Sequence, residues 1–583
     1  MLSSKSYSAP WWVFCVELKG PCCKTGDKMS LKLVTILKLA VFCSLMASLH
    51  GMDSQDSPPA SKKYKFLYFV SMVGGSHFSS LTMSGKELVK QGHKVVSLVS
   101  SSNTRKLRTA YADLFSVVVF NSSYTPEKRD SVMENVGRVV ATGALRGFWS
   151  QLGHGITDGS LTGDLNIGNM WLQECDDLLG DNATMQRLRE ERFDMMVADD
   201  HVPCPPLLAQ ALNIPFVFHS IVNPVPSKHG IWAGVLVDPS YIPERVLGFT
   251  DTMTFIQRVQ NVLAHIYYRY WWHFVFEFRR FDQLKMKYNI RPEINTYDSY
   301  KQALLYMFQG SPALDFPRPL HPNTKYILYT AGSTPRTTIE DDVAKFLDTA
   351  PSGVVLFSLG TFTGALELEI AQVIADGFAQ LPHRVLWLSS SAALPAGVKL
   401  ADNTMVVRWL PLPQVMEHPS IKVYVSHGGG LTMCEAIWAG LPMVGLPIFE
   451  DQLDNFDRLE SRGAGMALDI TTLTPEIFSR TIHEVSNNPR YRDNARRLSM
   501  IMRDMQVMSP PIKTAAHWIL HVTKFGGDHL RPAVMELNYV QRNLLDVYLF
   551  IFAVLALVPA VLLALCYCCC KRMCGKPGKL KEA

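Results

Sequence analysis

Residues 409–452 read WLPLPQVMEHPSIKVYVSHGGGLTMCEAIWAGLPMVGLPIFEDQ. The apolar runs Val423–Ser426 and Met443–Leu446 are each followed by a turn containing glycine or proline, and a helical stretch begins after each turn. This repeated order is typical of parallel strands whose connecting helices cover both faces of a sheet. The stretch therefore predicts an α/β fold with a doubly wound sheet.

The same alternation extends towards the N-terminus and forms two series. The series that contains residues 409–452 has further predicted strands and one covering helix, at Gly353–Leu359, Val385–Leu388, Met405–Val407 and Leu366–Gln380. The earlier series has predicted strands and one helix at Phe66–Val73, Lys94–Val99, Met195–Asp199, Ile214–Phe218 and Leu81–Gln91. A chain of 583 residues exceeds what one hydrophobic core usually supports. We therefore expect two doubly wound domains facing each other across a cleft.

A proline-rich passage separates the two series. Phe316–Pro322 reads FPRPLHP, a composition common in connections between domains. The sequence thus predicts a first domain over residues 52–318 and a second domain over residues 319–543.

Both ends of the chain carry targeting signals. Residues 1–51 comprise an N-terminal extension and then, from the alternative initiator Met29, the pattern of a secretory signal peptide. Residues 544–570 contain 19 uncharged positions, Val547–Leu565, which at about 1.5 Å per residue can cross a hydrocarbon core of about 30 Å. The basic tail, residues 571–583, predicts a cytoplasmic C-terminus and luminal domains.

Smaller features agree with a single-pass protein of the endoplasmic reticulum membrane. Lys579 and Lys581 resemble a dilysine retrieval signal, with an ordinary basic tail as the alternative. Asn121 and Asn182 begin glycosylation sequons. The net charge of +5 is too small for this length to favour nucleic-acid binding, so we expect a membrane and small molecules as partners.

The cysteines do not predict a disulfide scaffold. Four of the twelve lie at or before Cys43 and five at or after Cys566, which leaves Cys175, Cys204 and Cys434 between them. The C-terminal group follows the apolar run directly and lacks paired metal-ligand spacing. We therefore expect juxtamembrane thiols, open to acylation, rather than a metal site.

Residues 266–281 combine nine aromatic side chains with three arginines. This composition suits a membrane interface or an apolar acceptor pocket. Ordinary helix packing is an alternative of equal weight.

The turn His427–Gly430 ends a predicted strand and opens a predicted helix. Glycines there let backbone N–H groups approach a diphosphate, the helix dipole favours its charge, and His427 adds a side-chain donor. Glu435, two turns along the same helix, can accept hydrogen bonds from both ribose hydroxyls, and Trp409 can stack on uracil. Asp451–Gln452 begin the next helix and can meet sugar hydroxyls. Each feature has a structural alternative. The Gly-rich turn can be only a tight turn, Glu435 a surface carboxylate and Trp409 a core tryptophan.

Together these elements closely resemble the donor-binding signature of UDP-dependent glycosyltransferases, in particular the membrane-bound animal UDP-glucuronosyltransferases. The resemblance extends from about Phe66 through the basic tail. It implies two Rossmann-like domains of the GT-B type and one C-terminal transmembrane helix. It also implies a set of UDP-sugar-binding residues: Thr361, Trp409, His427, Gly428, Gly429, Glu435, Asp451 and Gln452. Three leucines depart from the family pattern and are left out of the predicted site: Leu388, Leu412 and Leu431.

A catalytic pair is expected in the first domain. His77 follows the first predicted strand and should face the cleft, and the family has its catalytic histidine in the matching Gly-Ser-His context. The family's partner aspartate matches Asp199 rather than the neighbouring Asp200. Transfer to a hydroxyl group needs a base and a carboxylate that orients it. Each residue alone is more often only a cap on a turn.

The resemblance implies inverting transfer of a sugar from a UDP-sugar to the hydroxyl of a small lipophilic acceptor. Glucuronic acid is the expected sugar, and UDP-glucose or UDP-galactose is the alternative donor. A non-catalytic partner of active relatives and a membrane receptor or lipid-binding protein are further alternatives. The chain lacks an Asp-x-Asp motif, so we expect no metal and no cofactor besides the UDP-sugar co-substrate. Acceptor identity and homo- or hetero-oligomerisation stay open.

Overall fold

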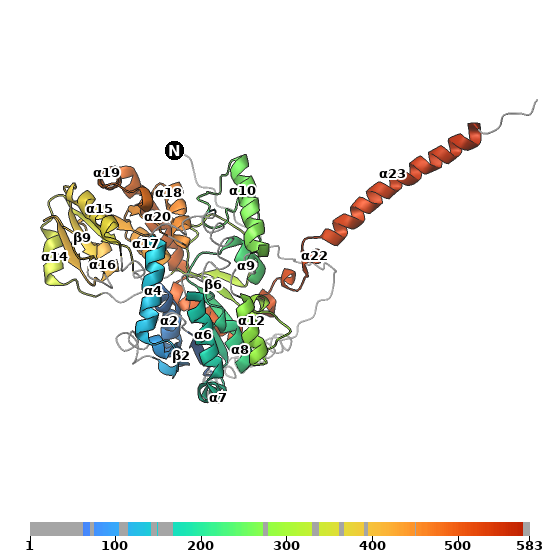
Figure 1. Cartoon of the computed structure of the whole chain (residues 1–583), viewed down its shortest axis with the longest axis horizontal. Coiled ribbons are helices and arrows are strands. Elements are labelled where there is room, and N and C mark those ends of the chain that lie inside the picture. The colour runs from blue at the N-terminus through green and yellow to red at the C-terminus, as the bar shows by residue number, and fades with distance from the viewer. Residues whose placement is uncertain are drawn as a thin grey trace, which may run out of the picture. The chain divides into compact units, whose positions relative to one another are not determined.

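The computed structural model describes residues 62–69, 75–103, 115–141, 149, 167–271, 278–328, 337–360, 366–389, 394–448 and 450–574. The elements below belong to one unit, Lys63–Ala583, and Figure 1 labels many of them. The predicted N-terminal extension and signal peptide, Thr361, and the basic tail from residue 575 onwards lie outside the described residues.

The first sheet has seven strands in the order β3-β2-β1-β4-β5-β6-β7, and every pairing is parallel. The strands are β1 (Lys65–Phe69), β2 (Lys94–Ser100), β3 (Ser116–Phe120), β4 (Met195–Ala198), β5 (Phe216–Ser220), β6 (Tyr306–Phe308) and β7 (Thr324–Tyr326). Central β1 pairs with β2 through Phe66 and Val95, and with β4 through Phe66 and Met195. The strand order grows outwards from β1 in both directions, which is the doubly wound arrangement that the sequence predicts.

Helices cover both faces of this sheet. They are α2 (Gly75–Lys90), α4 (Pro126–Ala141), α6 (Ile167–Gly180), α7 (Asn182–Glu191), α8 (Cys204–Leu212), α9 (Pro226–Trp232), α12 (Phe278–Lys287), α13 (Thr296–Ser299) and, from the end of the chain, α21 (Pro511–Phe525). A further helix, α10 (Phe255–Ile266), lies outside both cores and joins a small separate cluster through Ala264. Leu67 and Phe69 of β1 pack in a core with α6 and α8, while Phe66 and Tyr68 pack in another core with α2 and α21. Side chains alternate between faces along a strand, so an apolar strand supplies both cores.

The second sheet has six strands in the order β10-β9-β8-β11-β12-β13, again all parallel. The strands are β8 (Val354–Ser358), β9 (Arg384–Leu388), β10 (Thr404–Val407), β11 (Ile421–Ser426), β12 (Met443–Gly445) and β13 (Gly465–Ala467). The helices around it are α14 (Asp341–Asp348), α15 (Leu368–Ala379), α16 (Leu412–Met416), α17 (Gly430–Trp438), α18 (Asp451–Ser461), α19 (Pro475–Asn487) and α20 (Pro489–Met508). Val354 and Leu356 pack with α14, and Val355 and Phe357 pack with α15 on the other face. The predicted α/β architecture is confirmed for both sheets.

After the second sheet the chain returns to the first. Ala515 and Ile519 of α21 share a core with Phe66 and with Leu88 of α2. The chain then continues through α22 (Tyr539–Arg542) to α23 (Leu545–Cys574). By length and composition α23 can cross a membrane, as the sequence predicts.

The proline-rich passage 316–322 does not connect the two sheets, contrary to the sequence prediction. It joins β6 to β7, which pair in parallel through Phe308 and Tyr326. The first sheet therefore extends past residue 318, the predicted end of the first domain. Proline removes a backbone donor only at its own position, so the chain can resume pairing once the prolines are passed.

One disulfide lies in the first domain, where counting cysteines predicts no scaffold. Cys175 in α6 and Cys204 at the start of α8 are bonded across a sequence separation of 29 residues. The spacing of three internal cysteines carries no signal for this pair, because only the folded chain brings α6 and α8 together.

The aromatic segment 266–281 is described in part. Tyr267–Trp271 form one π-helical turn after α10, and residues 272–277 lie outside the described residues. Tyr268, Phe278 and Phe281 are buried in hydrophobic cores. Ordinary helix packing accounts for these three side chains.

Candidate active site

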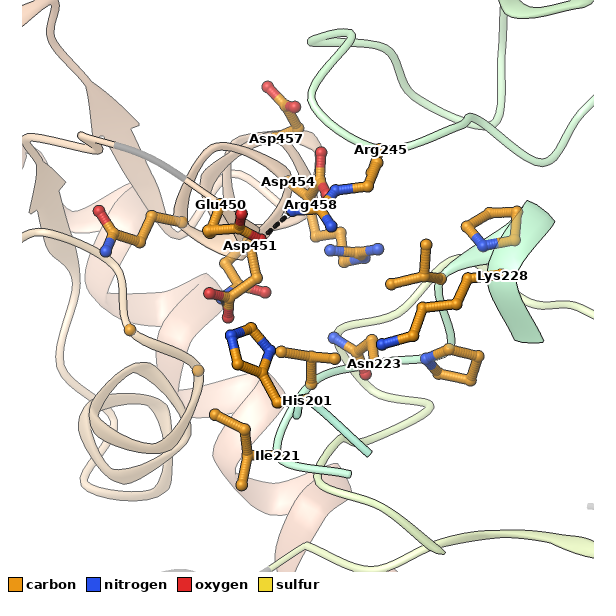
Figure 2. A pocket seen from close by; sticks show the side chains of 18 of the residues that line it. His201, Ile221, Asn223, Lys228, Arg245, Glu450, Asp451, Asp454, Asp457 and Arg458 are labelled. Carbon is orange, nitrogen blue, oxygen red and sulfur yellow. Dashed lines mark hydrogen bonds and ion pairs between the residues drawn. The ribbon is translucent and has the colours of Figure 1, made fainter. Parts of the chain in front are cut away.

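A cavity lies where loops after the carboxyl ends of strands from both sheets meet. It holds about 1370 Å³ of space, including its open mouth. His77, Lys228 and Arg245 line it from the first domain. His427, Gly429, Glu450, Asp451 and Gln452 line it from the second domain. Figure 2 shows Glu450 and Asp451 among the side chains around the cavity. In open α/β sheets, this edge is the usual place for ligands.

His77 and Asp199 are in direct contact. His77 lies in the first turn of α2, after β1, and Asp199 directly follows β4, the strand beside β1. A hydrogen bond joins His77 Nδ1 to Asp199 Oδ2, and both side chains are largely buried. The other carboxylate oxygen, Asp199 Oδ1, accepts from the backbone N–H of His201 at 3.1 Å. The aspartate is therefore held from two sides.

The neighbouring Asp200 has other partners. Its Oδ2 lies 2.7 Å from His229 Nε2 and 3.6 Å from Lys228 Nζ, and the side chain is fully buried. The next residue, His201, lines the cavity with its ring centroid 5.4 Å from that of His77. Burial, and then the charge of His77, lower the pKa of His201. The imidazole of His201, next to that of His77, is therefore neutral at neutral pH.

The Gly-rich turn follows β11 and opens α17. Gly428 has φ of +91°, and a Cβ there would lie 2.6 Å from the Phe456 ring, so only glycine fits. A Cβ on Gly429 would lie 2.8 Å from His427 Nε2. Gly429 is the N-cap residue and makes no side-chain cap hydrogen bond, and the first backbone N–H groups of a helix have no partner within the helix. Gly429 and Gly430 line the cavity. Burial lowers the pKa of His427 to about 4, so its ring is neutral at pH 7.

Asn455 fixes the turn against α18. Its Nδ2 donates to Gly428 O at 2.9 Å and to Asp451 Oδ2 at 2.7 Å. The amide oxygen of Gln452 accepts from Ile448 N at 2.9 Å. These hydrogen bonds fix the N-terminus of α18, from which Asp451 and Gln452 reach the cavity. Sequence reasoning missed Asn455, although its spacing of four residues from Asp451 on a predicted helix is a signal for contact.

Trp409 and Glu435 do not line this cavity. Trp409 is 59% exposed after β10. Glu435 lies on α17, and burial raises its pKa to about 7. The leucine that departs from the family pattern after the glycines, Leu431, does line the cavity and packs against the core that contains α2 and α21. The structure thus gathers His77, His427, Gly429, Asp451 and Gln452, with Gly428 buried behind them.

An ion pair that no motif predicts crosses the cavity. Arg245 Nη2, from the loop after α9, donates to Glu450 Oε2, directly before α18. The next backbone N–H, that of Val246, donates to Asp454 Oδ1 at 2.6 Å. Sequence reasoning passed over Glu450 although it precedes Asp451, and the path of the Arg245 loop depends on tertiary contacts.

A second ionic cluster ties the two domains together. Asp315, 1% exposed, accepts from Arg318 Nη2 at 2.8 Å and from Arg458 Nε at 2.9 Å. Its backbone oxygen accepts from Arg462 Nη2 at 3.0 Å. Arg458 of α18 and Arg462, directly after α18, are thereby held against the segment before β7.

Comparison with known proteins agrees with this geometry. The model of the family described as "UDP-glucoronosyl and UDP-glucosyl transferase" matches residues 67–580. UDP-glucuronosyltransferase 2B17 of Homo sapiens is 31% identical over 519 residues, covering 87% of this chain and 93% of that protein. UDP-glucuronosyltransferase 1A5 of Rattus norvegicus is 30% identical over 512 residues, covering 87% of this chain and 92% of that protein.

Two solved structures show the same fold at lower identity. The glycotransferase of kitacinnamycin superposes with a TM-score of 0.54 at 18% identity, covering 79% of this chain and 99% of that chain. Spinosyn forosaminyltransferase superposes with a TM-score of 0.51 at 15% identity, covering 79% of this chain and 100% of that chain. The fold is thus of the GT-B type. The chain belongs to the UDP-glucuronosyl and UDP-glucosyl transferase family and is a glycosyltransferase that moves a sugar from a UDP-sugar donor.

Proposed function

We propose that the protein transfers glucuronic acid from UDP-glucuronate to the hydroxyl of a small lipophilic acceptor, with inversion. The observation that carries the proposal is the hydrogen bond between His77 and Asp199 at the edge of a cavity that the second domain completes with Asp451 and Gln452. The relatives named UDP-glucuronosyltransferases support glucuronate as the sugar.

In this mechanism His77 is the base. Asp199 accepts a hydrogen bond from Nδ1–H, which leaves the lone pair of Nε2 to take the proton of the acceptor hydroxyl. The acceptor oxygen then bonds to the anomeric carbon while the bond from that carbon to the UDP oxygen breaks. The electron pair of the broken bond leaves with UDP. Attack opposite the leaving group inverts the anomeric configuration.

The second domain binds the donor in this proposal. The N–H groups at the start of α17 and the neutral ring of His427 donate to the diphosphate, and Asp451 and Gln452 accept and donate at the sugar hydroxyls. Thr361 belongs to the phosphate side, and Trp409 and Glu435 to uracil and ribose, by resemblance to the family. We propose catalysis without a metal, so a chelator should leave turnover of the pure enzyme unchanged.

The test is replacement of His77. His77→Ala should abolish UDP release with UDP-glucuronate and mixed phenols, while UDP binding by calorimetry stays within about twofold, because the base does not hold the nucleotide. His418→Ala, just after α16 and outside the cavity, is the matched control. Unchanged turnover in His77→Ala would refute the base. Wild-type protein that binds UDP but releases none from any UDP-sugar would favour the non-catalytic alternative.

We also propose a location and a domain division. The protein is anchored in the endoplasmic reticulum membrane by α23, with luminal domains and a cytoplasmic tail. The disulfide between Cys175 and Cys204 suits an oxidising lumen. The first domain runs to about Tyr326 rather than residue 318, because β7 belongs to its sheet.

A further inference from the structure

A second cavity lies beside the segment that leads into α23. It holds about 1030 Å³ of space, including its open mouth, and shares no lining residue with the cavity that contains His77. Its walls come from α9, the aromatic segment 266–281, α13 and α22. The proposed transfer reaction makes no use of this cavity.

The second cavity has more cations than carboxylates. Three arginines and one lysine line it, against two aspartates. Both aspartates already have partners within the protein. Asp298 Oδ1 lies 2.6 Å from Lys301 Nζ, and Asp282 Oδ1 accepts from the backbone N–H of Thr296 at 2.6 Å. The positive charge left over is therefore that of the arginines.

Two of these arginines, Arg269 and Arg542, have no carboxylate partner among the described residues. Arg542 Nη2 donates to the neutral backbone oxygen of Gly230, and Arg269 lies with its guanidinium carbon 5.7 Å from the ring centroid of Tyr270. Both arginines are half-buried. Burial, and then the charge of Arg269, lower the pKa of Arg542. Two guanidinium groups that repel each other in this way are stabilised by an anion bound between them.

The chemistry of the wall suits a phosphate group attached to an apolar body. The planar fork of an arginine donates two parallel hydrogen bonds to phosphate oxygens. Beside the arginines, the rings of Tyr270 and Tyr539 meet edge to face with their centroids 5.6 Å apart, and both line the cavity. Tyrosines are common where an apolar region meets a polar one, as at the surface of a bilayer.

The cavity is also close to the level of a membrane. Arg542 ends α22, and the helix that can cross a membrane begins three residues later at Leu545. Three residues span at most about 11 Å, and the headgroup layer on each side of a bilayer is about 5 to 8 Å thick. Leu537 and Tyr539 line the cavity and are 45% and 53% exposed, which leaves apolar surface for an acyl chain. A lipid headgroup beside α23 can therefore reach Arg542.

We propose that this cavity binds the phosphate group of an anionic membrane phospholipid between Arg269 and Arg542. The bound headgroup replaces the repulsion between the two arginines by attraction to a shared anion, and so holds α22 against the first domain. The proposal depends neither on the donor sugar nor on catalysis.

The experiment measures lipid binding by the full-length protein in detergent, using native mass spectrometry. Phosphatidylinositol should bind at least about tenfold more tightly than phosphatidylcholine, because only its headgroup carries a net negative charge. Arg269→Gln/Arg542→Gln should weaken binding of phosphatidylinositol by about 10- to 100-fold, the value of a charged hydrogen-bonded contact. An excess of inorganic phosphate should not displace the lipid, because it lacks the apolar body.

A matched control removes two cations at the other end of α23. Lys571→Gln/Arg572→Gln should leave the affinity for phosphatidylinositol within about twofold, because these residues do not line the cavity. UDP binding should stay within about twofold in both double variants, since the two cavities share no lining residue.

The outcomes decide the proposal independently of the proposed function. Wild-type affinity for phosphatidylinositol in the Arg269→Gln/Arg542→Gln variant overturns it, as does equal affinity of the wild type for the two lipids. Equal weakening in the control variant would assign the lipid to the basic tail, and displacement by inorganic phosphate would assign the cavity to a soluble anion. If the double variant does not fold, Arg269→Gln alone decides, because only Arg542 holds the backbone of α9.

Discussion

At the scale of single residues, Glu435 combines a predicted binding role with an unfavourable burial. It lies on α17, whose first turn is the Gly-rich segment, and its surroundings raise its pKa from 4.5 to about 7. A carboxyl group whose folded pKa is raised holds its proton more tightly in the folded state. Its contribution to stability is complete below pH 4.5 and is lost as the pH rises through about 7.

Glu435→Gln should therefore stabilise the protein at alkaline pH. At pH 8 the variant avoids burying a charge, and the free energy of unfolding should rise by up to about 3 kcal/mol, the equivalent of the pKa shift. At pH 5 the two proteins should unfold at similar temperatures, because Glu435 is then mostly protonated. Thermal unfolding of both proteins from pH 5 to pH 8 checks this, and a pH-independent difference would contradict it. If Glu435 binds ribose, the variant should also bind UDP more weakly.

Single residues also show what a sequence can and cannot predict about the site. His77, His427, Asp451 and Gln452 follow strand ends, and strand ends of parallel sheets gather at one edge, so their proximity could be predicted. The residues that contact these side chains and hold them in place could not be predicted. Arg245 reaches Glu450 across 205 residues of sequence, and no local pattern encodes such a contact.

At the scale of elements, the first domain depends on how α6 and α8 are joined. The bond between Cys175 and Cys204 links them, and α8 begins only five residues after Asp199. The disulfide therefore lies close in sequence to Asp199, the predicted catalytic carboxylate that follows β4. The strands themselves follow from apolar runs, whereas the bridge arises from packing of two helices far apart in sequence.

Replacing both cysteines by alanine should destabilise the first domain. A loop of 29 residues predicts a loss of about 3 to 4 kcal/mol in the free energy of unfolding, mainly through a less restricted unfolded chain. Thermal unfolding of the wild type and of Cys175→Ala/Cys204→Ala should differ under oxidising conditions and converge when a reductant opens the bridge. A difference that persists in reductant would show that packing of the sulfur atoms, rather than the bond, stabilises the helices.

At the scale of the whole molecule, the two sheets were predictable and the division between them was not. Apolar runs of the right length with turns between them indicate parallel strands wherever they occur. They do not say which sheet a short strand joins, and β7 has only three residues. The local sequence of α21 likewise does not predict that this helix packs against the first sheet, because its apolar face would suit either domain.

The membrane orientation is testable on the intact chain. Asn121 follows β3 and Asn182 begins α7, and both are exposed. If the domains are luminal, both asparagines should carry glycans, and Asn121→Gln and Asn182→Gln should each increase gel mobility by one glycan. Asn487→Gln, exposed but outside any sequon, should change nothing. In sealed microsomes, added protease should spare the two domains. Digestion of the domains would show that they face the cytoplasm and would contradict the luminal placement.

The return of α21 also determines how the two domains are connected to α23. The chain leaves the first domain after β7 and re-enters it at α21, so the second domain is an insertion tethered by two crossings. The segment that leads into α23 therefore continues from the first domain. We expect α23, once in a membrane, to hold the first domain directly and the second domain only through the first.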